Sequence, residues 1–156
     1  MATHDIRSTR RRAIVSPIWA QFFEDTSVPA AIRDGDTLYV TGHTGEDDDL
    51  TFAPDAEHQI RRTFMNIAQT LAEAGTDWSD VVEIVSYHVG LQSQGEVLLA
   101  VASEFLAKPF PAWTAVGVTE LWDEGSVVEI SCVAIVGGPR TWPTSTQASN
   151  EQRTSP

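Results

Sequence analysis

The sequence predicts an α+β fold in which two helices cover one face of a mixed β-sheet. Short β-prone runs alternate with two stretches of helical periodicity, in the order β-β-α-β-α-β-β. The run "VVEISCVAI" is apolar on both of its alternating faces, as expected of a strand that is covered on both sides. Two helices cover only one sheet face, so we expect a homo-oligomer built through the sheet to cover the other.

The first half of the chain carries a hairpin signal followed by a helix. The turn Asp34–Asp36 lies between the β-prone runs "AAIR" and "TLYVTGH", and an Asp-Gly pair is a strong signal for a tight β-turn. From Asp55 onward, apolar residues recur every three or four positions until Gly75, which predicts an amphipathic helix closed by a glycine. The apolar positions are Ile60, Phe64, Ile67, Leu71 and Ala74.

The second half adds a strand, a helix and two final strands. The β-branched and aromatic segment Asp80–Val89 predicts a strand, and Glu96–Lys108 predicts a second helix. Prolines at positions 109 and 111 are expected to end this helix, because proline cannot continue one. Trp113–Leu121 and Ser126–Val136 are the last two predicted strands, with "WDEG" turning between them.

Length and composition indicate one globular domain. The chain has 156 residues, of which 42% are apolar and 21% are charged, which is ordinary for a single domain with its own core. Residues 1–12 show no periodicity, and residues 141–156 are polar and rich in Ser and Thr. We therefore predict a flexible N-terminal tail at 1–12, one domain at 13–140, and a flexible C-terminal tail at 141–156.

The charge balance argues against a nucleic-acid partner. The formal net charge is −12, whereas nucleic-acid affinity depends mainly on Lys and Arg. The basic stretch "RSTRRR" falls largely in the predicted N-terminal tail. No apolar run approaches the roughly 20 residues of a membrane-spanning helix, and no apolar signal segment follows the arginines. We expect a cytoplasmic protein that binds neither nucleic acid nor membrane.

Cysteine and histidine usage predicts no metal site. Cys132 is the single cysteine, so no internal disulfide can form, and its apolar surroundings favour a buried, inert thiol over a reactive one. The four histidines are scattered and have no cysteine partner, so no zinc pattern is present. The run "EDDD" at positions 46–49 is interpreted as a solvated loop rather than a cation site. We expect neither a metal nor a cofactor.

Four segments match a known family in order and spacing: "GDTLYVTGHTG", "VVEIVSYHVG", "FPAWTAVGVTEL" and "VVEISCVAIV". From about Pro29 to Ile135 the chain resembles the Rid family, the RidA/YjgF reactive-intermediate deaminases. The resemblance implies a chorismate-mutase-like α+β subunit, a homotrimer, and three pockets between subunits. It also implies cofactor-independent hydrolysis of 2-aminoacrylate-type enamines and imines to 2-oxo acids and ammonia.

The sequence departs from this family where its members bind the substrate carboxylate. The family has an Arg there, whereas this chain has Trp113, as in the YjgH-type branch that it resembles. An indole cannot make the two charge-assisted hydrogen bonds that an Arg makes to a carboxylate. Val28 and Leu99 also stand where the family has an aromatic residue and an asparagine in its pocket. The standard Arg-dependent 2-iminoacid deaminase is therefore not expected.

Other matched positions keep the family's residue types. Glu129 matches the glutamate that positions the attacking water, and Thr114 matches the hydroxyl residue after the Arg. Thr41 and Gly42 match the backbone segment that approaches the substrate. Burial in an apolar strand raises the pKa of a carboxyl group, which suits a general acid or base. The alternative for Glu129 is a solvated residue or a salt bridge at an interface.

Four further side chains are candidates for the pocket. His43 either passes a proton to the substrate or hydrogen-bonds its own loop, and Trp113 either walls the pocket or packs in the core. Tyr87 reaches the pocket or the trimer core, and His88 is a weaker candidate because a histidine at a strand end is usually packed and hydrogen-bonded. The other tryptophans are assigned to the core or an interface: Trp19, Trp78, Trp122 and Trp142.

The sequence thus predicts a homotrimeric enzyme that acts on a small reactive metabolite in an inter-subunit pocket. The expected chemistry is hydrolysis or deamination of an enamine or imine, or related water and proton transfer, with Glu129 and His43 as the catalytic residues. Two alternatives remain open. One is a Rid homologue that binds a small molecule without catalysis, and the other is a pathway-specific cyclase or dehydratase of secondary metabolism.

Overall fold

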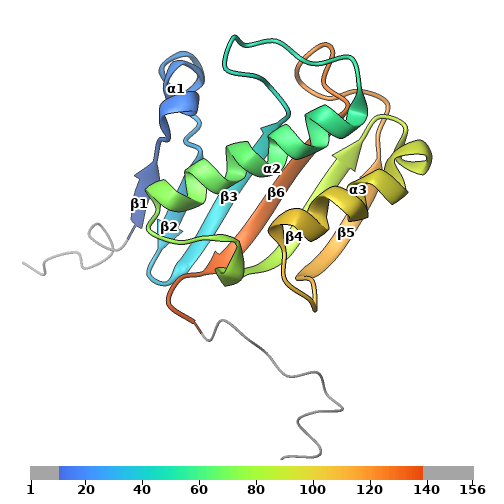
Figure 1. Cartoon of the computed structure of the whole chain (residues 1–156). Coiled ribbons are helices and arrows are strands. Elements are labelled where there is room, and N and C mark those ends of the chain that lie inside the picture. Colours follow the sequence, from blue (N-terminus) through green and yellow to red (C-terminus); the bar gives the residue numbers. More distant parts are fainter. Residues whose placement is uncertain (1–10, 139–156) are drawn as a thin grey trace, which may run out of the picture.

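The structure is a computed structural model that describes residues 11–138 (Figure 1). Its centre is a six-stranded sheet with the order β1-β2-β3-β6-β4-β5. β5 runs parallel to β4, whereas the other neighbours are antiparallel, so the sheet is mixed as predicted. The elements are β1 (Arg11–Ile14), η1 (Pro17–Trp19), α1 (Ala20–Thr26), β2 (Ala31–Asp34), β3 (Thr37–Thr44), α2 (Ala56–Glu73), η2 (Trp78–Asp80), β4 (Val81–His88), α3 (Leu91–Phe105), β5 (Ala112–Gly117) and β6 (Val128–Ile135).

Helices α2 and α3 lie side by side on one face of the sheet (Figure 1). The carboxylate of Asp55 caps α2 by accepting a hydrogen bond from the backbone N–H of His58 at 2.8 Å. Gly75 follows the helix with a φ of 78°, a left-handed conformation that glycine adopts without strain. The apolar positions predicted for this helix are all buried, which confirms the amphipathic pattern.

The core lies between α2, α3 and the sheet, around the fully buried ring of Phe64. The centroid of this ring is 5.0 Å from that of Trp78 and 5.2 Å from that of Phe105. Cys132 points into the same core, and burial raises the pKa of its thiol to about 12. The thiol is therefore neutral at physiological pH, in agreement with the inert role predicted for it.

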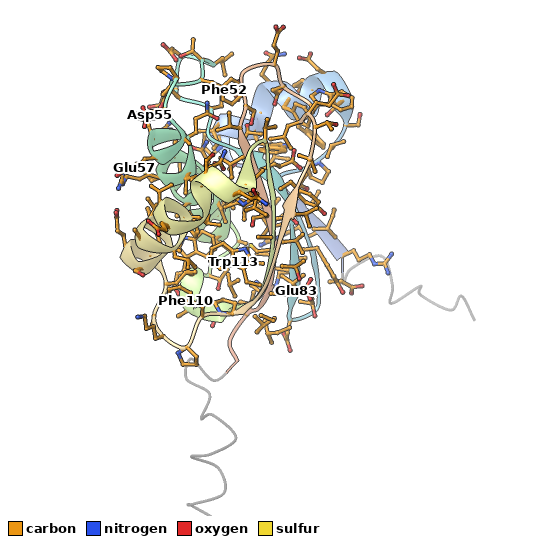
Figure 2. The ribbon with its side chains drawn as sticks, turned by 90° about the vertical axis from the view of Figure 1, so that its right-hand side faces the viewer. Phe52, Asp55, Glu57, Glu83, Phe110 and Trp113 are labelled. Atoms are coloured by element: carbon orange, nitrogen blue, oxygen red, sulfur yellow. The ribbon has the colours of Figure 1, made fainter. Side chains whose placement is uncertain are left out.

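The opposite face of the sheet is left open in the single chain. Along β3, Leu38 and Val40 are buried under the helices, whereas Tyr39 between them is 54% exposed on the other side. Tyr39 stands opposite Val133 of β6. Figure 2 shows Glu83 of β4 on this open side, away from the helices. The alternation along each strand thus separates a core face from a face that is free for another surface.

Two elements are not revealed by sequence periodicity. β1 begins at Arg11, inside the segment predicted to be a tail, and pairs antiparallel with β2. It has four residues, and α1 has seven, so neither is long enough to show a repeating pattern of apolar positions. Residues 11 and 12 of the predicted N-terminal tail thus belong to a strand, whereas residues 1–10 and the predicted tail at 141–156 lie outside the described residues.

Element boundaries also differ from the predictions. α3 begins at Leu91 rather than Glu96, because Gly90, with a φ of 85°, turns the chain directly from β4 into the helix. It ends at Phe105, three positions before the predicted end at 108, and β5 ends at Gly117 rather than 121. No helix within residues 11–138 is long and apolar enough to cross a membrane.

Replacing Phe64 with Ala should remove about 3–5 kcal/mol from the free energy of unfolding, because it leaves a cavity between Trp78 and Phe105. Urea denaturation followed by circular dichroism measures the loss. The matched control is Met65→Ala on the same helix, where the side chain is 42% exposed and the expected loss is below about 1 kcal/mol. Equal losses in the two variants would contradict the assigned core.

Candidate functional site

A cavity of about 200 Å³ lies at the end of the sheet where three separate segments meet. The first segment runs from η1 through α1 to the chain that follows it. The second is the end of β3 with the loop after it, and the third is the β5–β6 connection with the start of β6. Figure 1 shows α1 and the loops after β3 and β5 at the same end of the molecule. The lining residues are Ile18, Trp19, Phe22, Val28, Thr41, Gly42, Thr44, Glu46, Trp122, Asp123 and Glu129.

Glu129 is the central polar residue of this cavity. It lies on the open face of β6, between the buried residues Val128 and Ile130, and is opposite Thr44 of β3. β3 has a bulge between Val40 and His43, which brings Gly42 against the glutamate. A Cβ at Gly42 would overlap Oε1 of Glu129, so glycine is required for the carboxylate to lie against the backbone. The predicted grouping of Thr41, Gly42 and Glu129 is therefore present.

Electrostatic conditions in the cavity favour protonated carboxyl groups. Burial, and secondarily the negative charge of Asp123, raises the pKa of Glu129. The same two causes raise the pKa of Glu46. No Lys, Arg or His is among the lining residues of this cavity. An upward shift in the pKa of a carboxyl group favours its protonated form, and such a shift is common in residues that act as a general acid or base.

Aromatic side chains form the walls. The indole N–H of Trp19 donates to the carbonyl oxygen of Val28 at 2.8 Å, which holds this ring in place over the cavity. The Trp19 ring also packs edge-on against Phe22, with centroids 5.1 Å apart. Trp122 lies at the rim and is 82% exposed. The cavity thus combines a half-buried carboxyl group with flat apolar surfaces.

A buried glutamine ties the loop that carries Asp123 to helix α2. The side-chain amide of Gln59 donates to the carbonyl oxygens of Ala53 at 2.7 Å and Gly125 at 2.9 Å. Its side-chain oxygen accepts a hydrogen bond from the backbone N–H of Val127 at 2.9 Å. Three bonds from one buried side chain therefore fix the β5–β6 connection beside the cavity.

His43 is separated from Glu129 by the sheet. Its Nδ1 donates to the carbonyl oxygen of Thr41 at 2.7 Å, and its Nε2 accepts from the hydroxyl of Thr70 on α2 at 2.9 Å. Burial lowers the pKa of His43 to about 4, and the bond to Thr41 opposes this shift only partly. Both ring nitrogens are thus occupied, and the ring lines a neighbouring cavity of about 340 Å³. This arrangement matches the alternative of a hydrogen-bonded histidine and gives the predicted catalytic role of His43 no support in the single chain.

Trp113 also differs from its predicted role as a pocket wall. Its side chain packs on the core, with its ring centroid 6.3 Å from that of Phe64 and 6.4 Å from that of Phe110. The indole N–H donates to the buried hydroxyl of Ser86 at 2.9 Å. Figure 2 shows Trp113 and Phe110 on the helix side of the sheet. Within the single chain, Trp113 is a core residue and does not line the cavity of Glu129.

The remaining predicted site residues divide into three groups. Val28 lines the cavity as predicted. Tyr87 is opposite Glu129 on the open face, and Thr114 is exposed on the same face of β5, but neither lines the cavity. Leu99 is 55% exposed on α3, and His88 is fully buried with Nδ1 2.8 Å from Oε1 of Gln94. The structure therefore does not place Leu99 or His88 at this site.

Several lining residues were missed by the sequence reasoning. Trp19 and Trp122 were assigned to the core or an interface, and Glu46 to a solvated loop, whereas all three line the cavity. The aromatic density of "PIWAQFF" was the signal that could have identified Trp19 and Phe22. Trp142 lies outside the described residues. Among residues 11–138, no group of three or more His, Cys, Asp or Glu side chains is arranged to hold a metal ion.

A His43→Gln variant should remove part of the acid sensitivity of the fold. Because the pKa of His43 is about 4 in the folded state and 6.5 in the unfolded state, the unfolded chain binds the extra proton first as the pH falls. His43 therefore costs the wild type roughly 3 kcal/mol of stability between pH 6.5 and pH 4. Urea denaturation at pH 7.0, 5.5 and 4.5 measures this difference.

The test compares the wild type with the variant, because other groups also change the stability as the pH falls. The raised pKa values of Glu46 and Glu129 add stability toward acid, and they do so equally in both proteins. Gln92→Ala, at an exposed and non-titrating position of α3, is the control and should keep the wild-type pH dependence. If His43→Gln loses stability toward acid as steeply as the wild type does, His43 is not held neutral in the folded state.

The comparisons with known proteins agree on one family. The family model described as Endoribonuclease L-PSP matches residues 24–136. The chain is 43% identical over 106 residues to the RutC family protein YjgH of Escherichia coli (strain K12), which is 67% of this chain and 79% of that protein. A 2-iminobutanoate/2-iminopropanoate deaminase of Dermatophagoides farinae is 28% identical over 109 residues, 68% of this chain and 83% of that protein.

A solved structure of protein YjgH is also similar in its fold. It superposes with a TM-score of 0.73 at 37% sequence identity, over 83% of this chain and 99% of the other. The family-model match at residues 24–136 includes strands β2 to β6, helices α2 and α3, and the segments on which the sequence resemblance rests. The chain therefore belongs to the Rid/YjgF family, whose model carries the L-PSP description.

Proposed function

We propose that this protein hydrolyses a small enamine or imine in the cavity that holds Glu129, without a cofactor and without an Arg-carboxylate contact. The observation that carries the proposal is the half-buried carboxyl group of Glu129, which faces an aromatic cavity and has a raised pKa. Membership of a family that includes a protein named as an imine deaminase supports the reaction class. Trp113 supports the difference in recognition, because it occupies the matched position and packs in the core.

The chemistry needs one group that gives and takes protons. Protonated Glu129 donates its proton to the β-carbon of an enamine, which becomes an iminium ion. Water then attacks the iminium carbon and gives a proton back to the carboxylate, which forms a carbinolamine. Glu129 next protonates the amine nitrogen, the C–N bond breaks and ammonia leaves, and the hydroxyl gives its proton to the Glu129 carboxylate as the carbonyl forms. The net reaction is enamine plus water giving a carbonyl compound plus ammonia.

The neighbouring residues have supporting roles in this proposal. Thr41 is held by its hydroxyl, which donates to the carbonyl oxygen of Pro29 at 2.7 Å. Gly42 allows the carboxyl group to approach the backbone, and the aromatic walls exclude bulk water from the iminium carbon. His43 stays neutral and holds the bulge of β3 through its bond to Thr41, so it acts as a positioning residue.

We also propose that the chain assembles as a homotrimer through the open face of the sheet. Apolar side chains on this face are partly or largely exposed in the single chain, and such a surface is typical of an interface. Tyr87 and Thr114 lie on the same face and would come to an interface rather than to the cavity of their own chain. The apolar residues on the face are Ile32, Tyr39, Val85, Val116, Val133 and Ile135.

Glu129→Gln should lower ammonia release from the substrate by about 10²-fold or more, because the amide cannot shuttle the proton. The assay uses a panel of imines formed in situ by oxidation of primary amines, with and without a carboxylate. Gly42→Ala should cause a comparable loss, because the added methyl group displaces the Glu129 carboxyl group.

The matched control for this experiment is Glu96→Gln, which removes the same charge at an exposed position of α3 and should keep wild-type turnover. Full activity of Glu129→Gln would rule out the mechanism. Binding of substrates by the wild type with no turnover above the spontaneous rate would instead favour a small-molecule-binding homologue.

Tyr39→Asp should convert the trimer to smaller species, because it places a charge in the centre of the open apolar face. Sedimentation velocity at micromolar concentration measures the assembly state. Leu99→Asp is the matched control, since Leu99 is 55% exposed on the helix side and Tyr39 is 54% exposed on the open side. The proposed interface is wrong if the wild type is a monomer or if both variants remain trimeric.

A further inference from the structure

We propose that the cavity of Glu129 selects a ligand that carries a positive charge next to a flat apolar body, such as a protonated aromatic amine or the matching iminium ion. Carboxylate ligands are disfavoured at the same place. This inference rests on the cavity named in the proposed function and specifies its substrate class. It is carried by two independent features of the lining, its charge and its aromatic surface.

The charge of the lining has one sign. Glu46, Asp123 and Glu129 come from three different segments of the chain and line the same cavity. The negative charge of Asp123 is felt by both glutamates, whose pKa values it helps to raise. Ionised carboxylates in one cavity repel one another, so a bound cation would relieve the repulsion and a bound anion would add to it.

The cationic side chains near this end of the protein are already engaged elsewhere. Arg62 donates through Nε to the carbonyl oxygen of Glu46 at 3.2 Å and pairs with Asp48, and it lines the neighbouring cavity rather than this one. His43, in that neighbouring cavity too, is held neutral by burial. Among residues 11–138, no cationic side chain lines this cavity to meet a carboxylate.

The aromatic surface is the second feature. Trp19 and Phe22 form an inner wall that is fixed by the bond from Trp19 to Val28, and Trp122 stands exposed at the rim. The faces of these rings carry partial negative charge and attract cations, most strongly for Trp. A flat ligand that packs against Trp19 would also contact Trp122, whose indole is 82% exposed and would become less exposed on binding.

This selectivity has a chemical consequence for the proposed reaction. Water attacks the carbon of an iminium ion, the protonated form of an imine, much more readily than it attacks the carbon of a neutral imine. A cavity that stabilises positive charge raises the fraction of bound substrate in the iminium form. The same carboxyl groups that select the ligand therefore also activate it.

The test measures equilibrium binding of three probes that share one ring: benzylamine, benzyl alcohol and benzoate. Isothermal titration calorimetry at pH 7.5 and low fixed ionic strength gives the dissociation constants, with tryptophan fluorescence as a second readout. We expect benzylamine, which is protonated at this pH, to bind about tenfold more tightly than benzyl alcohol. Benzoate should bind most weakly.

Variants separate the two features. Asp123→Asn should weaken benzylamine severalfold and leave benzyl alcohol unchanged, whereas Glu96→Gln, with the same loss of charge on α3, should change neither. Trp122→Ala should weaken the binding of benzylamine more than the binding of benzyl alcohol. Because Trp122 is exposed, this variant should still fold. Thermal melting confirms that each variant is folded.

Benzoate binding as tight as benzylamine binding would overturn the inference, and so would a failure of all three probes to bind. The inference would also be overturned if Asp123→Asn, like Glu96→Gln, left benzylamine binding unchanged. The outcome is distinguishable from that of the proposed function, because binding needs no turnover. Preferred benzylamine binding with no imine hydrolysis would leave this inference standing and remove the enzyme, and hydrolysis with preferred benzoate binding would do the reverse.

Discussion

Burial of one face of the sheet under α2 and α3 is the constraint on which the rest of the structure depends. Side chains alternate along each strand, so once Ile130 and Cys132 are committed to the core, Glu129 must face the other side. The aromatic cluster around Phe64 determines which face of β6 packs against the helices. A strand turned the other way would expose Ile130 and Cys132 and bury the Glu129 carboxylate in the core. The position of the candidate catalytic group is thus a consequence of core packing.

The same constraint explains what happens at Trp113. A long polar side chain at this position can leave the helix side and reach a site, whereas an indole gains more by packing beside Phe64 and Phe110. Its one polar atom is satisfied by Ser86 within the core. Trp113 therefore contributes to the packing of the core in the single chain, and the charge of the cavity comes from the carboxyl groups that line it.

The sequence supported much of the fold and part of the site. Helix α2 followed from its apolar spacing, the β2–β3 hairpin from its Asp-Gly turn, and the pairing of Gly42 with Glu129 from the family resemblance. The sequence left two interpretations open for His43 and for Trp113; in the single chain both side chains lie on the helix side of the sheet, because neighbours in sequence at a strand or bulge can face opposite sides. α1 was missed because its seven residues carry no measurable period.

By itself, the sequence determined the order of the elements, the amphipathic face of α2 and the family, because these depend on local spacing and on matching words along the chain. Only the tertiary structure decided which side chains share the cavity. Trp19, Glu46, Asp123 and Glu129 come from segments far apart in sequence, and the packed sheet and the anchored β5–β6 connection bring them to one place. Their common charge and aromatic character arise from that convergence, which no local pattern encodes.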